Sequence, residues 1–338
     1  MSKKAVVLVN VGTPDSTKVF DVAKYLHEFL GDGRVIDLPW LSRKLLVNFI
    51  IVPFRSPKSS KLYKKVWDEK GSPLLYLTEN LADKLRKELG ESYDVHIGMR
   101  YQNPSLEKLI KSNELQKYSE VIFIPLFPQY ASSTTGTVIE LIYKSLANRD
   151  VIPKINVISQ FYNHPDFINC FAENISTFNV AEYDFVIFTY HGLPLSHINR
   201  VHPEIPESSC NCQNEFPEHG QYCYKACCFE TTRLLLKKTG IAPEKSITSF
   251  QSRLTNKWLK PFSDEVIIEY AKQGKKRGLI VAPSFTTDCL ETIVELGIDY
   301  DELFQSHGGE KLDMVPSLND NDLFVQFLKK LVIGEKSI

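Results

Sequence analysis

The sequence has no long uninterrupted apolar segment. Its longest apolar stretch, residues 45–54, is interrupted by Asn48 and Pro53, and it is far shorter than the roughly 20 residues that cross a bilayer. The apolar run near the N-terminus ends at Asn10, which is too short for a secretory signal. These absences favour a cytoplasmic protein over an exported or membrane-spanning one.

Strong net charge and the common nucleotide-binding motifs are also missing. The net charge is -1, from 40 basic and 41 acidic side chains, so nothing indicates a nucleic-acid partner. No GxGxxG motif follows the first predicted strand, and no GxxxxGK[ST] motif is present, so a nucleotide-dependent enzyme is poorly supported. The length of 338 residues and the ordinary apolar content favour two domains of usual size.

What the chain does contain is a regular alternation of apolar strands and amphipathic helices. Strands are predicted at residues 5–10, 93–98, 121–127, 157–161, 185–190, 247–251 and 279–283. Helices are predicted at 21–30, 105–117, 165–176, 229–239, 263–273, 287–296 and 319–331, with further ones from the turn at 71–74 to about residue 89 and after residue 136. This spacing is typical of parallel sheets covered by helices. Residues 10–14 and 190–194 share one pattern, which indicates that the second half repeats the first.

A histidine follows one of the buried strands. His191 comes directly after the apolar run 185–190, at the sheet edge where open parallel sheets bind their ligands. For a lone histidine, a buried side chain with a single hydrogen bond is the plainer interpretation. The strand at 279–283, however, leads to Asp288 and Glu291, so an imidazole and carboxylates would meet at one edge.

The carboxylates after that strand have two interpretations. On a helix beginning near residue 287, Asp288, Glu291 and Glu295 lie along one face. Such an acidic column beside an imidazole can bind a divalent cation or carry protons. The alternative is a capping box, because Asp followed three residues later by Glu is typical of a helix N-terminus.

Residues 36–67 interleave large apolar side chains with lysines and arginines. One interpretation is a core helix with a solvated basic face. The other is a partly exposed apolar lip with a basic rim, suited to a flat apolar anion or a membrane surface.

Five of the seven cysteines lie within residues 210–228. In a chain without an export signal, clustered thiols indicate metal ligands before disulfides. This segment has three prolines nearby and no apolar periodicity, so a bound metal would stabilise it. Four thiolates suit either a [2Fe–2S] cluster or Zn2+.

Several motifs, in order along the chain, together resemble the ferrochelatase family. They are VNVGTP at 9–14, PQYASSTTG at 128–136, HGLP at 191–194, FQSRL and WLKP within 250–261, and APSFTTDCLET at 282–292. The resemblance implies an α/β protein with two similar Rossmann-like domains of the type II chelatase fold. These would span residues 1–178 and 179–317, with a porphyrin cleft between them and a C-terminal helix within 318–338 packing back on the first. It also implies insertion of Fe2+ into protoporphyrin IX, the last step of heme biosynthesis.

The resemblance assigns roles to individual residues. His191 and Glu291 match the family's metal-binding and catalytic pair, and Asp288 and Glu295 match its acidic column. The residues expected to contact the porphyrin are Val11, Arg100, Tyr101, Gln129, Tyr130, Ser132, Trp258 and Phe285. The residues expected in an apolar lip, which would touch the porphyrin or the inner face of a membrane, are Leu45, Phe49, Ile50 and Arg55.

Two features indicate which branch of the family the chain resembles, and each leaves an alternative for the substrate or for the cluster ligands. In the branch that uses coproporphyrin a tyrosine stands at the position of Val11, so protoporphyrin is the expected substrate and coproporphyrin the alternative. The thiols lie in an insertion, 203–228, as in bacterial members with an internal [2Fe–2S] cluster. The expected ligands are Cys210, Cys212, Cys223 and Cys228, with Cys227 as the alternate. More distant alternatives are a cobalt or nickel chelatase for another tetrapyrrole, and a tetrapyrrole-binding iron or redox sensor.

Overall fold

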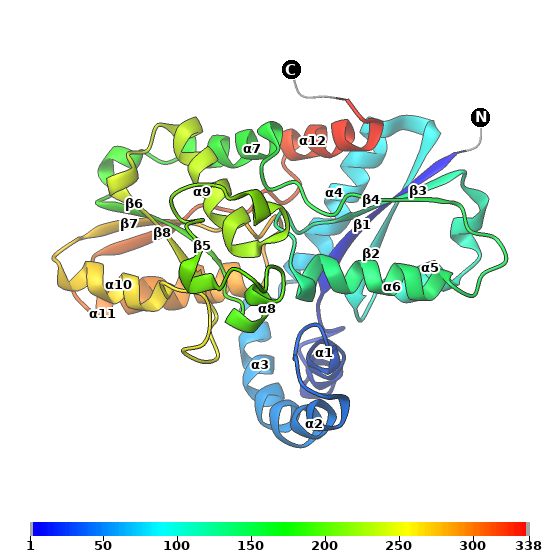
Figure 1. Cartoon of the computed structure of the whole chain (residues 1–338), viewed down its shortest axis with the longest axis horizontal. Coiled ribbons are helices and arrows are strands. Elements are labelled where there is room, and N and C mark those ends of the chain that lie inside the picture. Colours follow the sequence, from blue (N-terminus) through cyan, green and yellow to red (C-terminus); the bar gives the residue numbers. More distant parts are fainter. Residues whose placement is uncertain (1–2, 336–338) are drawn as a thin grey trace.

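The computed structural model describes residues 3–335 and contains two four-stranded parallel sheets, one in each half of the chain (Figure 1). The first sheet has the order β2-β1-β3-β4, with β1 Lys4–Gly12, β2 Tyr93–Tyr101, β3 Glu120–Pro125 and β4 Lys154–Val157. The second has the order β6-β5-β7-β8, with β5 Phe185–His191, β6 Ser246–Gln251, β7 Arg277–Val281 and β8 Lys311–Met314. Central strands β1 and β5 are almost wholly buried because helices cover both faces of such sheets. The α/β class with two parallel sheets is confirmed.

Helices connect successive strands and cover both sheets. In the first half they are α1 Val19–Gly31, α2 Trp40–Leu45, α3 Val52–Val66, α4 Pro73–Leu89, α5 Leu106–Lys111, α6 Thr137–Leu146 and α7 Pro165–Ser176. In the second half they are α8 Leu195–Asn199, α9 Tyr224–Thr239, α10 Ser263–Lys272, α11 Tyr300–Ser306 and α12 Asp322–Ile333. Three further segments are π-helices: η1 Leu46–Ile51, η4 Ser132–Gly136 and η9 Glu291–Asp299.

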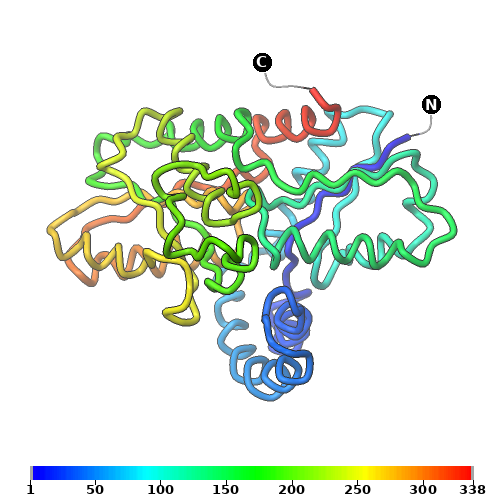
Figure 2. Tube along the Cα trace, in the orientation of Figure 1, coloured from blue at the N-terminus to red at the C-terminus, as the bar shows by residue number. Residues whose placement is uncertain are grey.

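The two halves share one continuous apolar core. Side chains of β1 and β5, including Leu8 and Phe188, belong to the same buried cluster. Helix α12 packs beside α4 and α7, so the end of the chain returns to the first half (Figure 2). Ion pairs join α12 to the first half: Lys329 Nζ on α12, for example, lies 3.0 Å from a Glu88 carboxylate oxygen on α4. Residues 336–338 of the segment predicted to pack back lie outside the described residues.

Some predicted elements begin, end or lie elsewhere. The strand predicted at 157–161 lies at Lys154–Val157, and the helix predicted at 105–117 ends at Lys111 and gives way to a 3-10 turn at Glu114–Lys117. Helix α9 begins five residues before its predicted start. Strand β8 was not predicted, because only Leu312 among its four residues is buried and the segment carries no strand pattern.

Helices α1 to α3 project away from both sheets, on the side opposite α12 (Figure 1). Leu45, Phe49 and Ile50 are exposed there by 50%, 70% and 56%, and Arg55 is exposed as well. The core-helix interpretation is therefore wrong for these residues, since within η1 only Val47 is buried. Among the described residues, no helix is long and apolar enough to cross a membrane.

Candidate active site

His191 is the last residue of β5 and lies half-buried at the carboxyl edge of the second sheet. The next residue, Gly192, donates its N–H to Gln251 O at 2.8 Å, and a Cβ at Gly192 would lie 2.7 Å from that oxygen. Glycine thus lets the ends of β5 and β6 approach each other. His191 Nδ1 lies 2.8 Å from Gly192 O, which can only accept, so Nδ1 is the donor. In the neutral imidazole Nε2 is then left free to take a proton or bind a metal.

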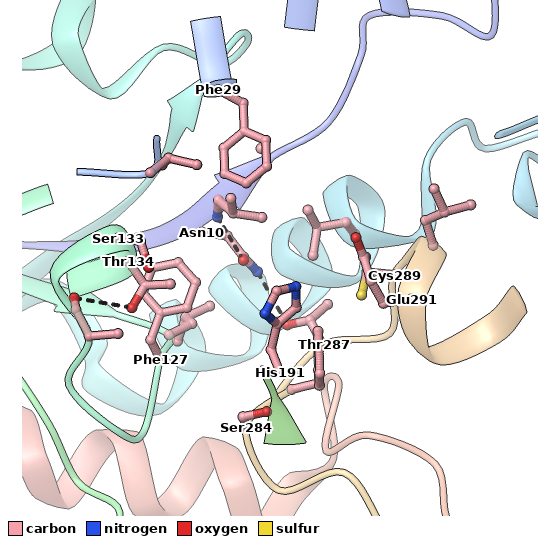
Figure 3. A pocket seen from close by; sticks show the side chains of 18 of the residues that line it. Asn10, Phe29, Phe127, Ser133, Thr134, His191, Ser284, Thr287, Cys289 and Glu291 are labelled. Carbon is pink, nitrogen blue, oxygen red and sulfur yellow. Dashed lines mark hydrogen bonds between the residues drawn. The ribbon is translucent and has the colours of Figure 1, made fainter. Parts of the chain in front are cut away.

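A cavity of about 200 Å³ lies at the carboxyl ends of both sheets. It is walled by the end of β1, the loop after β3, the end of β5, the loop after β7, and side chains of α1 and α3. His191 and Glu291 both line it, and Figure 3 shows the His191 ring between Phe127 on one side and Glu291 on the other. The structure therefore brings together the imidazole and the carboxylate that the sequence placed at two strand ends.

Glu291 is the first residue of the π-helix η9. A carboxylate at this position is favoured, because the free N–H groups at a helix N-terminus carry partial positive charge. π-helical turns are rare and occur frequently at functional sites. The Cys289 thiol beside Glu291 is buried, and burial raises the pKa of that thiol, so the thiol stays neutral.

Glu295 lies one turn beyond Glu291, outside the cavity lining. Its carboxylate accepts hydrogen bonds from the Ser252 hydroxyl at 2.6 Å and from the Tyr300 hydroxyl at 3.3 Å. Burial raises the pKa of the Glu295 carboxyl, while the Ser252 bond and the nearby His191 lower it. The net direction is upward, so Glu295 takes up a proton at a higher pH than an exposed glutamate does.

Asp288 does not belong to the acidic column. It precedes the helix, which begins later than residue 287, so the spacing argument for a shared face is wrong here. Its carboxylate accepts from Asn319 Nδ2 at 2.7 Å and from Ser317 N at 3.4 Å, and it does not line the cavity. The capping-box alternative is also wrong, because these bonds fix the loop after β7 to residues 317–319 and do not cap η9.

The predicted porphyrin-contacting residues divide into two groups. Those that line the cavity are Val11, Gln129, Trp258 and Phe285. Those that lie outside its lining are Arg100, Tyr101, Tyr130 and Ser132.

The second group is engaged elsewhere. Arg100 Nη2 and the Tyr101 hydroxyl both donate to one oxygen of Asp32, at 2.6 and 3.0 Å. Ser132 Oγ accepts from Arg34 at 2.9 Å, so Ser133 and Thr134 face the cavity instead.

Other lining residues were not predicted as site residues. Tyr224 lines the cavity and donates its hydroxyl hydrogen to His191 O at 2.9 Å. His197 also lines it, and burial lowers the pKa of this imidazole. Tyr25 and Tyr63 reach it from α1 and α3. Pattern reasoning missed them because none of them lies directly after a predicted strand.

The five clustered cysteines, in the second half of the chain, lie outside the cavity lining, although Tyr224 between them belongs to it. Cys210 Sγ lies 3.4 Å from His219 Nε2, and Cys223 Sγ lies 3.3 Å from His202 Nε2. All five thiols are buried. Within residues 3–335 no three His, Cys, Asp or Glu side chains converge closely enough to hold a metal ion.

The last two cysteines of the segment, Cys227 and Cys228, point to different faces of helix α9. It starts directly after Cys223, so Cys227 lies about one turn later on the same face, whereas Cys228 is rotated by roughly 100° from Cys227. Cys227 Sγ donates to the carbonyls of Gly220 and Gln221 at 3.5 and 3.6 Å. Cys228 instead interacts with the buried Tyr224. This geometry favours Cys227 over Cys228 as a partner of Cys223.

Comparison with known proteins gives consistent matches. The family model described as Ferrochelatase matches residues 3–336. A ferrochelatase of Legionella pneumophila (strain Lens) is 39% identical over 336 residues, which cover 98% of each chain. A ferrochelatase of Coxiella burnetii (strain Dugway 5J108-111) is 38% identical over 335 residues, covering 98% of this chain and 93% of the relative.

The fold has a similar solved structure. SirB from Bacillus subtilis, determined with Fe3+, superposes with a TM-score of 0.52 at 12% identity and covers 99% of both chains. At this identity the likeness concerns the fold alone.

Proposed function

The chain belongs to the ferrochelatase family, and we propose that its porphyrin substrate is protoporphyrin IX, into which it inserts Fe2+. The observation that carries the proposal is the pair formed by His191 and Glu291 in one cavity with largely apolar walls. Val11 supports protoporphyrin over the more polar coproporphyrin, because it adds an apolar side chain to the cavity wall.

The reaction sets two tasks that these residues fit. Two pyrrole N–H protons must leave as the metal enters, and the flat ring must be bent to expose its nitrogens. Apolar walls that hold a bent ring lower the barrier by favouring a shape close to the transition state. His191 Nε2, free in the neutral ring, accepts a pyrrole proton.

The carboxylates complete the proton and metal path. Glu291 faces the cavity, where it binds Fe2+ or receives a proton from His191, since carboxylate and imidazole both suit Fe2+. Glu295, with its pKa raised by burial, takes the proton one turn further along η9. Protons thus leave along η9 while the ring stays between its apolar walls.

The substrate is tested by anaerobic Fe2+ insertion, followed by absorbance, with protoporphyrin IX and coproporphyrin compared in the same preparation. We expect kcat/KM to favour protoporphyrin IX. A preference for coproporphyrin would contradict the proposed substrate, and insertion of Co2+ or Ni2+ without Fe2+ would contradict the metal.

We also propose a cytoplasmic location, with the lip formed by Leu45, Phe49, Ile50 and Arg55 resting on the inner face of a membrane. Its exposed apolar side chains lie next to basic ones, an arrangement suited to anionic lipid. Because the lip projects away from both sheets, membrane contact would leave the core undisturbed.

The lip prediction concerns Phe49→Asp with Ile50→Asp. These two exposed side chains contribute little to the core, so Tm should change by only about 2 °C, as for most surface substitutions. Sedimentation with anionic phospholipid vesicles should show that binding is lost. Tyr143→Asp on α6, an equally exposed aromatic position outside the lip, is the matched control and should still bind. A large fall in Tm would place the two residues in the core instead.

The cysteine segment is proposed to hold a [2Fe–2S] cluster. The chemistry of the donors supports this proposal, because five buried thiols lie within residues 210–228 and the buried Lys225 ammonium, paired with Glu207, interacts with Cys212. Among the described residues no three of these side chains converge, so a cluster would have to draw the thiols together. Burial raises the pKa of Cys212 to about 12, and the Lys225 charge only partly opposes this shift. The residues that would hold the cluster are Cys210, Cys212, Cys223 and Cys227. The bound cluster would cross-link a segment that has little apolar core of its own.

The colour of the purified protein and its iron and sulfide content test the proposed cluster. Freshly purified protein should be reddish-brown, with about two iron and two acid-labile sulfides per chain. Cys227→Ser should bleach it, because Cys227 shares a helix face with Cys223. Cys228→Ser is the adjacent control and should keep its colour. Colourless protein with one zinc per chain would contradict the cluster, and bleaching by Cys228→Ser alone would contradict the ligand assignment.

A further inference from the structure

Helix α9 contacts both the cysteine segment and His191. It begins at Tyr224, directly after Cys223, and the Tyr224 hydroxyl donates to His191 O at 2.9 Å. Tyr224 is only 6% exposed, and it also forms part of the cavity wall. A side chain at the start of the cysteine-bearing helix therefore holds the main chain of His191.

The His191 carbonyl has no neighbouring strand to bind it on the side of β7. The pairing of β5 with β7 ends at Phe188↔Val281, while the pairing with β6 continues to His191↔Gln251. Gly192 N–H points to β6, and successive residues of a strand point their main-chain groups to alternate sides. The carbonyl of His191 therefore points to the side that β7 has left, and Tyr224 supplies the hydrogen bond that a strand would otherwise give.

The Tyr224 hydroxyl has a single hydrogen to donate, and that hydrogen is committed to His191 O at 2.9 Å. The Cys228 thiol, one turn further along α9, interacts with the same hydroxyl. Tyr224 therefore connects a cysteine of α9 with the main chain of His191.

The same helix also orients a second cavity residue. Gln129 Nε2 donates to Thr231 Oγ1 at 3.0 Å, and Thr231 Oγ1 donates to Cys227 O at 2.9 Å. This leaves Gln129 Oε1 without a hydrogen-bond partner among the described residues, in a side chain that is 2% exposed and lines the cavity. Two polar cavity groups therefore take their position from α9.

We propose that Tyr224 is a positioning residue for His191, and that through it the cysteine-bearing start of α9 sets the orientation of the imidazole in the cavity. The inference rests on the role of His191 in the proposed function. A change at the thiols that moves the first turn of α9 then alters metal insertion without any contact between the thiols themselves and the porphyrin.

The first test is Tyr224→Phe, which removes only the hydroxyl. We expect kcat to fall about tenfold, short of the roughly 100-fold that a 1 Å displacement of a reacting group can cost, with KM for porphyrin unchanged. Tyr190→Phe is the matched control, because Tyr190 is buried and its hydroxyl bonds Thr232 of the same helix at 2.9 Å, not a group of His191. It should lower Tm to a similar extent and leave kcat within about twofold of wild type. Equal kcat losses in both variants, or an unchanged kcat in Tyr224→Phe, would overturn the proposal.

The second test asks whether a change at a cysteine of α9 affects turnover through Tyr224. Cys228→Ala removes the thiol that touches the Tyr224 hydroxyl and should lower kcat by about threefold, the effect of one neutral hydrogen bond. In the Tyr224→Phe background the same change should have no further effect on kcat. If the two effects multiply, the residues act independently and the transmission is refuted. Wild-type turnover in His191→Ala would instead refute the proposed role of His191, which separates that failure from failure of the positioning role.

Discussion

Replacing His191 with alanine should lower kcat for Fe2+ insertion by at least about 100-fold, the lower end of the contribution of a positioned general base. The expectation follows from the free Nε2 of a half-buried imidazole in the cavity shared with Glu291. Within the described residues its side chain makes a single hydrogen bond, to the carbonyl of the next residue, so stability should fall by only about 1 kcal/mol. The protein should therefore remain folded while it loses activity.

The measurement is anaerobic turnover together with far-UV circular dichroism and porphyrin binding. His307→Ala is a suitable control, since His307 is exposed beyond α11 and bonds only local groups in the described structure. It should retain wild-type turnover. Turnover above about a tenth of wild type in His191→Ala, with a native spectrum, would assign His191 a structural role instead.

The strands that place His191 were predictable because they are continuous apolar runs. Strands β1 and β5 are buried on both faces, so their sequences need no alternation and stand out against the polar loops. The end of such a run marks the carboxyl edge of the sheet, and His191 lies there. The position of the imidazole at this edge of the sheet thus followed from strand length and parallel topology.

The predicted acidic column of Asp288, Glu291 and Glu295 shows a limit of predicting a shared helix face from residue spacing. Three-residue spacing predicts a shared face only if both residues are helical, and the helix begins after Asp288. Its first turns are also π-helical, with a wider spacing than the α-helix that periodicity assumes. Tertiary bonds from Asn319, distant in sequence, decide the position of Asp288, and no local pattern contains that information.

Arg100 and Tyr101 illustrate the same limit on the other wall. Both lie at the end of β2, an edge where ligands are expected, yet Asp32 draws both side chains toward itself. Tyr224 is the opposite case, because it lies in a segment without strand pattern and still reaches the cavity. Which polar side chains face a cavity depends on partners that only the packed chain brings together.

Replacing Glu291 with glutamine should also lower kcat by at least about 100-fold, because it keeps the shape of the side chain and removes the charge that binds Fe2+ or accepts a proton. Glu291 faces the cavity at the first turn of η9, so the effect should fall on the insertion step. Protoporphyrin binding, measured by fluorescence quenching, should stay within about threefold of wild type, because the cavity walls near the ring are largely apolar.

Asp288→Asn provides the matched control for Glu291→Gln, since it makes the same chemical change three residues earlier. Asp288 accepts bonds from Asn319 Nδ2 and Ser317 N and does not line the cavity. The amide would face the Asn319 amide as a donor, so stability should fall by about 1–3 kcal/mol while kcat per folded molecule stays near wild type. Comparable kcat losses in the two variants would mean that the acidic residues act as one column after all. Normal turnover in Glu291→Gln, with a loss of stability alone, would reduce Glu291 to a helix-terminal charge that stabilises η9.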